Sequence, residues 1–199
     1  MTKQYDQAYF DRWYRDPRHR VTTPASVRRK VRLVLGIAEA LLERPVTRIL
    51  DIGCGEASWR SHFLGERPKA EYIGIDSSDY VVERFGRTRG IRHGTFGTVG
   101  QVGLTDGFDC IVCCDVLQYV RSEELGPGLR AVAALLDGVA FLEAFTSADQ
   151  LEGDKQHWHQ RTPAWYRRTF RDAGLTAVGM HCYVGPGLLG ATLALERAE

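Results

Sequence analysis

Two carboxylates stand at the ends of apolar, strand-like runs, and the first is followed at once by a glycine turn. Asp51 lies near the end of the run 46–52, and Gly53 and Gly55 come directly after it. Glycines permit a tight turn and allow a ligand to approach the backbone more closely than any Cβ would. A carboxylate beside such a turn repels a pyrophosphate and attracts an ammonium group. The spacing therefore predicts a binding turn for a ligand that carries a cationic group.

The second carboxylate, Asp76, ends the apolar run 70–76. A carboxylate at the end of a strand can accept hydrogen bonds from both hydroxyls of a ribose. Ligands of open parallel sheets bind beyond the carboxyl ends of the strands, where Asp51 and Asp76 would meet. Proteins that bind nicotinamide dinucleotides also use such an acid, so Asp76 alone does not exclude a dinucleotide as the ligand.

Alternating strands and helices are needed to carry these acids to one edge. Apolar runs predict strands at the residue ranges 46–52, 70–76, 91–96, 108–114 and 139–145. Helices are expected between them at 58–64, 80–87 and 122–136, with a break or delayed start caused by Gly126 and Pro127. This alternation predicts a parallel sheet with helices on both faces.

Helical patterns flank this region. Aromatic residues between Tyr5 and Tyr14 predict a short helix with an aromatic stripe, and Ser26 is the expected N-cap of a longer helix. Near the other end, Thr162 is the expected N-cap of a helix that stops at Gly174. Two apolar runs, 175–184 and 188–195, are joined by the turn 185–187 and predict an antiparallel hairpin.

The segment 46–55 resembles motif I of the class I S-adenosylmethionine (SAM) dependent methyltransferases. The dinucleotide fingerprint G-x-G-x-x-G fits less well, because Ser58 occupies the place of its third glycine. The segment 115–120 resembles the motif IV region of small-molecule members and lacks the Asn/Asp-Pro-Pro-aromatic motif of enzymes that methylate nucleobases and glutamine. The step from 170 to 175 into the hairpin is also similar to this family. The resemblance implies a Rossmann-like three-layer α/β sandwich with a mostly parallel seven-stranded sheet and an antiparallel C-terminal strand.

The resemblance also implies which residues hold the cofactor SAM. Asp51 and the glycine turn would face its methionine half, and Asp76 its ribose. The loop after the third strand would contact the adenine, and in this loop Thr95 and Phe96 take the place of the acidic residue that many family members carry. Tyr14, in the helical lid, would contact the carboxylate of the cofactor. The complete set expected to bind the cofactor is Tyr14, Asp51, Gly53, Gly55, Asp76, Ser77, Thr95, Phe96, Asp115 and Val116.

Three residues are candidates for a general base. His157 and His159 lie in the connection 146–161, which borders the acceptor site in proteins of this fold, and an imidazole titrates near neutral pH. Glu143 lies at the end of the fifth strand. The alternatives for the histidines are a surface or structural role, or a metal ligand with Asp154. We expect no metal, because three candidate ligands in one loop, without further ligands elsewhere in the sequence, are a weak indication of a metal site.

Composition bounds the class of protein. The chain has 199 residues, 44% of them hydrophobic, and no apolar run near the roughly 20 residues of a membrane span. We therefore expect one domain over 1–199, with a helical lid (1–44) and a SAM-binding core (45–199). The N-terminus lacks the apolar segment of a secretion signal, and the five cysteines are an odd number, so we expect a cytoplasmic protein, monomeric or homodimeric, without a membrane partner.

Charge bears on the methyl acceptor. The net charge is +1, but residues 1–50 hold eleven Lys/Arg against five Asp/Glu. The excess is interpreted as a solvated helix face, with an anionic or RNA partner as the alternative. The sequence thus predicts methyl transfer to an oxygen or nitrogen of a small molecule, with nucleic acid disfavoured as a partner. An RNA methyltransferase and a non-catalytic SAM- or nucleotide-binding protein remain as alternatives.

Overall fold

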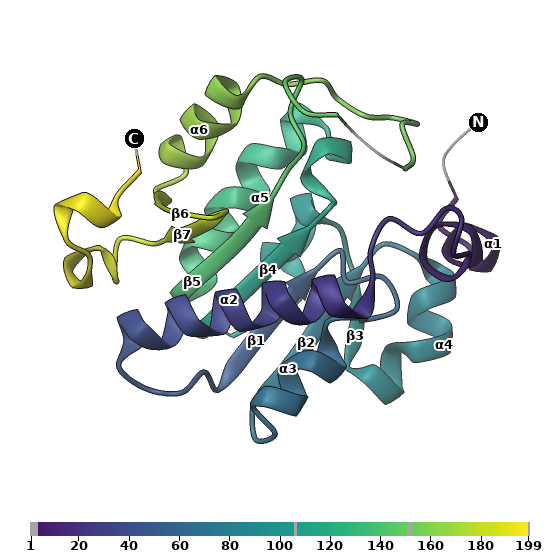
Figure 1. Cartoon of the computed structure of the whole chain (residues 1–199), viewed down its shortest axis with the longest axis horizontal. Helices are drawn as coiled ribbons and strands as arrows, with labels where there is room; N and C mark the ends of the chain where they lie inside the picture. Colours follow the sequence, from purple (N-terminus) through teal and green to yellow (C-terminus); the bar gives the residue numbers. More distant parts are fainter. Residues whose placement is uncertain (1–3, 106, 151–152, 199) are drawn as a thin grey trace.

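A seven-stranded sheet forms the centre of the computed structural model, which describes residues 4–105, 107–150 and 153–198 (Figure 1). Its strand order is β3-β2-β1-β4-β5-β7-β6. The strands are β1 (Arg48–Ile52), β2 (Glu71–Asp76), β3 (Ile91–His93), β4 (Phe108–Cys114), β5 (Leu136–Glu143), β6 (Thr176–Gly179) and β7 (Cys182–Val184). The helices are α1 (Gln7–Phe10), α2 (Pro24–Leu42), α3 (Arg60–Glu66), α4 (Asp79–Arg89), α5 (Ser122–Leu135) and α6 (Pro163–Asp172).

The directions and order of the strands show where a ligand of this sheet would bind. β1 pairs in parallel with both β2 and β4, and β5 continues the parallel set beside β4. Because the chain runs outward from β1 to β3 and then returns to β4, the strand order reverses between β1 and β4. Ligands of open α/β sheets bind at this switch point. β7 lies antiparallel between β5 and β6, so the predicted fold class, with its antiparallel C-terminal hairpin, is confirmed.

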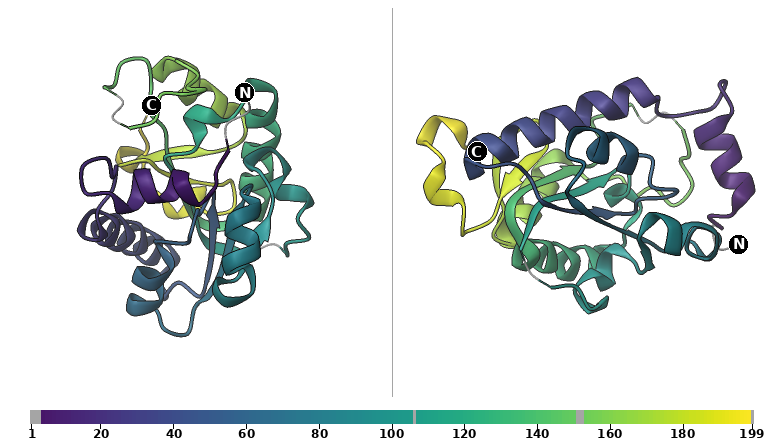
Figure 2. Two further views of the ribbon diagram at one scale, coloured as in Figure 1. Left: turned by 90° about the vertical axis from the view of Figure 1, so that its right-hand side faces the viewer. Right: turned by 90° about the horizontal axis from the view of Figure 1, so that it is seen from below.

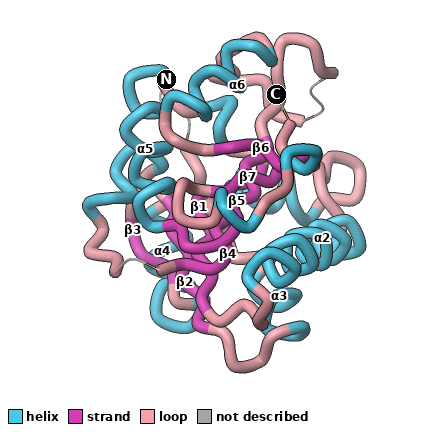
Figure 3. The backbone as a smooth tube through the Cα atoms, turned by 90° about the vertical axis from the view of Figure 1, so that its left-hand side faces the viewer, coloured by secondary structure: helices cyan, strands magenta, loops and turns pink. Residues whose placement is uncertain are grey.

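Alternating side chains of the strands build two apolar layers. Ile49 packs with α2, α3 and α4 on one face, while its neighbour Leu50 packs with α5 and α6 on the other. Figures 2 and 3 show α2 and α3 on one side of the sheet and α5 on the other. Burial on both faces explains why the central strands are continuous apolar runs rather than alternating ones.

The C-terminal hairpin differs from the prediction in its position. Its two-residue loop is Met180-His181, with φ of 50° and 62°, and the prediction of a loop at 185–187 was wrong. The run 188–195, expected to be a strand, forms two 3₁₀ turns instead, and Leu195 is fully exposed. The left-handed backbone of this hairpin loop suits the right-handed twist of the strands, but its two residues lack the usual Gly or Asn signal.

Three local predictions also need correction. Thr23, not Ser26, caps α2, and Ser26 completes the capping box from the third helical position. α5 continues through Pro127 without a break, because its apolar face is buried and Gly128 packs closely on Phe96. The third strand ends at His93, and a 3₁₀ helix, Phe96–Gln101, follows. No helix in the described part of the chain has the length and apolar character of a membrane span.

Candidate active site

Two adjoining cavities open beyond the carboxyl ends of the parallel strands. The β2-side cavity has a volume of about 240 Å³, and the β5-side cavity about 290 Å³. Tyr14, Gly53 and Asp115 line both cavities and form their junction. The junction therefore lies at the switch point between β1 and β4, where one elongated ligand could occupy both cavities.

Asp76 is fixed at the edge of the β2-side cavity. Its carboxylate is 8% exposed and accepts hydrogen bonds from the backbone N–H of Gly55 (2.7 Å) and of Ser78 (2.9 Å). Burial raises the pKa of Asp76, although these hydrogen bonds oppose the rise. The contact with Gly55 ties the end of β2 to the glycine turn after β1. Asp76 and Ser77 both line the cavity, where the sequence predicted a ribose site.

Asp51 lines the β5-side cavity and is 3% exposed. The hydroxyl of Tyr72 donates a hydrogen bond to its carboxylate at 2.6 Å. Burial raises the pKa of Asp51 to about 7, although the Tyr72 hydrogen bond opposes the rise and Asp76 adds to it. A cationic group in the cavity would favour the charged form of Asp51, so this environment suits an ammonium ligand.

The raised pKa of Asp51 predicts that the free protein loses stability as pH rises from about 4 to about 7. The folded chain holds the Asp51 proton more tightly than the unfolded chain does. The protonated carboxyl group therefore stabilises the fold at low pH, and this stabilisation is lost as the pH rises to the pKa of the folded state. From pH 7 to pH 5 the wild type should gain about 2 kcal/mol more in free energy of unfolding than Asp51→Asn. Urea unfolding at both pH values measures this difference. Equal gains in both proteins would contradict it.

The glycine turn is as tight as the sequence predicted. Gly53 and Gly55 have φ of +70° and +52°, a backbone region that favours glycine. A Cβ added to Gly53 would lie 2.4 Å from Cγ2 of Val116, which follows β4. Gly53 thus lines both cavities, and the side chain of Val116 packs closely against it.

The loop after β4 supplies the opposite side of the junction. Asp115 has φ of +59° and accepts a hydrogen bond from the side-chain amide of Gln118 at 2.5 Å. Thr95 and Phe96 line the β2-side cavity as predicted for an adenine site. The Thr95 hydroxyl also accepts a hydrogen bond from the backbone N–H of Thr98 and so caps the 3₁₀ helix. Thr95 therefore has a structural task as well.

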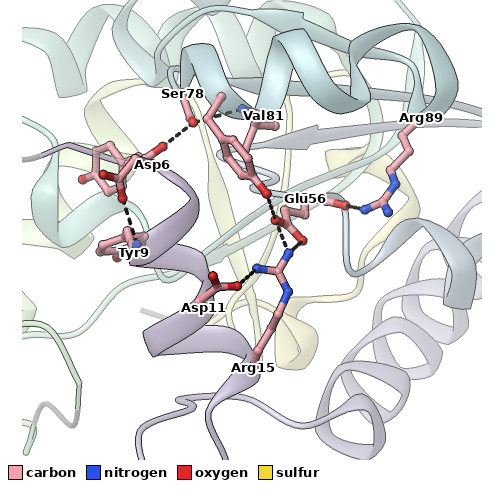
Figure 4. Close-up of polar contacts among 10 residues, drawn as sticks. Asp6, Tyr9, Asp11, Arg15, Glu56, Ser78, Val81 and Arg89 are labelled. Atoms are coloured by element: carbon pink, nitrogen blue, oxygen red, sulfur yellow. Dashed lines mark hydrogen bonds and ion pairs between the residues drawn. The ribbon is translucent and has the colours of Figure 1, made fainter.

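The N-terminal aromatic residues, for which the sequence predicted a lid, line the β2-side cavity. Tyr5, Tyr9, Phe10 and Tyr14 all line it, and the rings of Phe10 and Tyr14 lie 5.5 Å apart. Arg15, in the π-helical turn Asp11–Arg15, ties this segment to the glycine turn, because its Nη2 lies 2.5 Å from both carboxylate oxygens of Glu56 (Figure 4). Arg89 of α4 donates a hydrogen bond to the Glu56 carbonyl and fixes that residue from the other side.

Breaking this ion pair should loosen the lid without unfolding the core. In Glu56→Gln we expect amide hydrogen exchange at residues 7–15 to rise about threefold, a modest change because Arg15 is partly solvated. The matched control is Arg18→Gln, since Arg18 is 83% exposed and pairs only locally with Asp16. A lid that exchanges at the wild-type rate in Glu56→Gln, or equally fast in both variants, would show that the pair does not hold it.

The three candidates for a general base differ in whether they line a cavity. Glu143 lines the β5-side cavity, whereas neither His157 nor His159 is among the described residues that line either cavity. The backbone N–H of His159 donates to the carbonyl of Gln118, and burial, with Arg161 nearby, lowers the pKa of its imidazole. The described residues contain no group of three His, Cys, Asp or Glu side chains that could hold a metal ion.

Sequence reasoning missed several residues that line the cavities. Lys30 of α2 and Trp59 line the β5-side cavity, and Glu124 of α5 lines the β2-side cavity. Lys30 was counted only as one of the eleven cations in residues 1–50. The available signal for Lys30 was its position on an amphipathic helix, three residues after Val27 and four before Val34, which are both buried.

The structure thus combines a Rossmann-like fold with two adjoining cavities at its switch point. The sequence model of one family, described as "Methyltransferase domain", matches residues 18–177. The chain therefore belongs to this methyltransferase family, and its predicted membership of the class I SAM-dependent methyltransferases is confirmed. No curated protein matches the chain significantly.

Solved structures share the fold at low identity. The plantazolicin methyltransferase BamL, in complex with a triazolic desmethylPZN analog and SAH, has a TM-score of 0.64 at 14% identity, over 94% of this chain and 79% of that one. DesVI from Streptomyces venezuelae has a TM-score of 0.63 at 15% identity, over 81% and 91%. Magnesium protoporphyrin IX methyltransferase from Synechocystis PCC 6803, with bound SAH, has 0.57 at 19%, over 90% and 92%. The chain spans 57% of the plantazolicin methyltransferase BpumL.

Proposed function

We propose that this protein is a SAM-dependent methyltransferase of the EC 2.1.1 class that transfers a methyl group to an oxygen or nitrogen of a small molecule. Asp76 and Ser77 would hold the ribose of SAM, with Thr95, Phe96 and Val116 around the adenine. Asp51, Gly53 and Gly55 would hold the methionine half, together with Tyr14 and Asp115. The cytoplasmic location and the monomeric or homodimeric state stay predictions.

One observation carries this proposal: the two cavities meet at Gly53, between the carboxylates of Asp76 and Asp51. The residues fit the ligand, because Gly53 lines both cavities and a buried carboxylate lines each of them, Asp76 on the β2 side and Asp51 on the β5 side. A nucleoside in the β2-side cavity would place an attached ammonium group near Asp51. A dinucleotide would instead bring a pyrophosphate toward that acid, which is unfavourable wherever Asp51 is ionised.

The protein's own contribution would be alignment and exclusion of water. SAM, when bound, supplies a methyl group already activated on a sulfonium. The glycine turn and Asp115 would orient the donor, and the aromatic lid held by Arg15 would cover it. Such positioning can lower the barrier by roughly 7–11 kcal/mol. A base in the β5-side cavity would matter where the acceptor must lose a proton.

A small-molecule acceptor is favoured over RNA by how the basic N-terminal residues are paired. Of the ten cations that the structure describes in residues 4–50, six form ion pairs with carboxylates, namely Arg15, Arg18, Lys30, Arg32, Arg44 and Arg48. Five of these cations pair with carboxylates that lie after residue 50, so core residues offset much of the positive excess. The methyltransferases for plantazolicin and magnesium protoporphyrin IX share the fold and support a small acceptor by analogy. An acceptor KM that rises steeply with salt would favour RNA instead.

A thermal-shift comparison of SAM, S-adenosylhomocysteine, NAD and ATP tests the proposal. A ligand at about 100 times its Kd should stabilise the folded chain by about 2.7 kcal/mol. We expect shifts with SAM and S-adenosylhomocysteine and none of comparable size with NAD or ATP. A larger shift with NAD would overturn the proposal, and SAM binding without turnover on any acceptor of a broad panel would favour the non-catalytic alternative.

A further inference from the structure

A polar cluster lies on the wall of the β5-side cavity, opposite the glycine turn. The ammonium group of Lys30, from α2, lies 2.5 Å from the carboxylate of Glu143 at the end of β5. The thiol of Cys114, at the end of β4, donates a hydrogen bond to the same carboxylate at 2.7 Å. All three residues line the cavity. This cluster brings a cation and a carboxylate together at one point, from elements far apart in the chain.

The contacts within the cluster shift the pKa values of Lys30 and Cys114. Burial opposes the charged form of Lys30, but the hydrogen bond and charge of Glu143 favour it, and the pKa of Lys30 lies above the ordinary value. Burial, with the charge of Glu143 nearby, raises the pKa of the Cys114 thiol well above its usual range. Cys114 is thus a neutral donor, while Lys30 and Glu143 form an ion pair whose ammonium side chain is 36% exposed.

Apolar and aromatic side chains line part of this cavity, together with the polar residues Thr22, Ser26, Ser58 and Gln150. Val27 precedes Lys30 by one helical turn, and Tyr14 and Phe145 also line the space. Trp59 is 7% exposed and packs on Phe141 with ring centroids 5.7 Å apart, so its ring is held in place. Walls of this kind suit a flat, largely apolar acceptor with one polar group directed at the cluster.

We propose that the methyl acceptor is an aromatic molecule with an acidic hydroxyl group, bound against Lys30 and Glu143. This inference rests on the proposed function and specifies its acceptor. The hydroxyl proton passes to the Glu143 carboxylate while the Lys30 ammonium stabilises the phenolate oxygen. That oxygen forms the new bond to the methyl carbon. The carbon–sulfur bond of SAM breaks with its electron pair on sulfur, leaving S-adenosylhomocysteine, and Glu143 later releases its proton to water.

The sign of the charges favours a hydroxyl over an amine. A phenol that loses its proton becomes an anion, which Lys30 attracts. An amine gains nothing from Lys30 when it loses a proton, and its protonated form is repelled by the ammonium group. A carboxylate is a weak base toward an aliphatic alcohol, so Glu143 suits an acidic, phenol-type hydroxyl.

The probe for this proposal is 4-nitrophenol, whose phenolate is yellow, bound to the complex with S-adenosylhomocysteine. In the wild type we expect the apparent pKa of the bound phenol to fall by about one unit, since a nearby opposite charge favours the ionised form. Lys30→Met should abolish this fall. Glu143→Gln should enlarge it, because the ammonium group loses its counter-ion. The matched control is Arg29→Met, an exposed cation on the same helix, which should behave as the wild type.

Methyl transfer to 4-nitrophenol then separates the two roles. Glu143→Gln should lose on the order of 100-fold in rate at a pH where bound 4-nitrophenol is protonated in both proteins, and recover at a pH where the bound phenol is ionised. Failure of 4-nitrophenol to bind, or an unchanged pKa in Lys30→Met, would overturn the proposal. Lys30→Met weakening S-adenosylhomocysteine as much as 4-nitrophenol would also overturn it, by making Lys30 a cofactor residue. A normal thermal shift with S-adenosylhomocysteine in each case would leave the proposed function itself intact.

Discussion

Replacing Asp76 with Asn should lower the affinity for SAM by about 100-fold or more. The proposed site gives both ribose hydroxyls to this carboxylate, and hydrogen bonds to a charged group contribute about 1.5–3 kcal/mol each. Losing two such hydrogen bonds at about 1.5 kcal/mol each costs about 3 kcal/mol, which corresponds to a roughly 100-fold increase in Kd. Titration calorimetry with SAM and with S-adenosylhomocysteine measures the effect directly.

The control for this experiment must separate binding from folding, because Asp76 also accepts hydrogen bonds from Gly55 and Ser78. Urea unfolding of Asp76→Asn in the absence of ligand reports that structural part. Asp79→Asn is the matched variant, since Asp79 begins α4 three residues later and its side chain is 87% exposed. It should bind SAM like the wild type. An Asp76→Asn protein that folds normally and retains wild-type affinity would remove the ribose site from the account.

Replacing Gly53 with Ala should destabilise the protein and weaken SAM binding together. The residue has φ of +70°, where a non-glycine residue costs about 1–2 kcal/mol, and the new methyl group would lie 2.4 Å from a methyl of Val116. Overpacking of this kind adds about 1–3 kcal/mol. We expect the free energy of unfolding to fall by about 3 kcal/mol and the affinity for SAM to fall at least tenfold.

A double variant divides this effect into its causes. Gly53→Ala combined with Val116→Ala relieves the contact but leaves the backbone conformation unchanged, so stability should recover only in part. Gly65→Ala is the control, because nothing lies within 4 Å of a Cβ there; it should leave stability unchanged or raise it by up to about 1 kcal/mol. A Gly53→Ala protein with wild-type stability and affinity would mean that the turn is not the tight cradle described.

The strand ends and the cofactor side of the site could be predicted from the sequence. Buried parallel strands are continuous apolar runs, so Asp51 and Asp76 stood out as acids at their ends. The glycines that follow β1 could be interpreted because their backbone requirement is local. Local patterns of this kind fixed the fold class before any contact between distant residues was known.

The acceptor side depends on contacts that no local pattern encodes. Lys30 and Glu143 are 113 residues apart and meet only because α2 packs across β4 and β5. The histidines at 157 and 159 were candidates for their chemistry, but the course of their loop decides whether they reach a cavity. The hairpin loop at Met180 was missed for a related reason, since pairing between β5 and β7 imposes a turn that its residues do not favour alone.

A crystal structure of the complex with S-adenosylhomocysteine tests the central claim most directly. The account predicts the adenosine in the β2-side cavity, both ribose hydroxyls within hydrogen-bond distance of the Asp76 carboxylate, and the sulfur at the junction formed by Tyr14, Gly53 and Asp115. The open space next to the sulfur should then face Lys30 and Glu143. Adenosine found in the β5-side cavity, or ligand bound away from the glycine turn, would contradict the account.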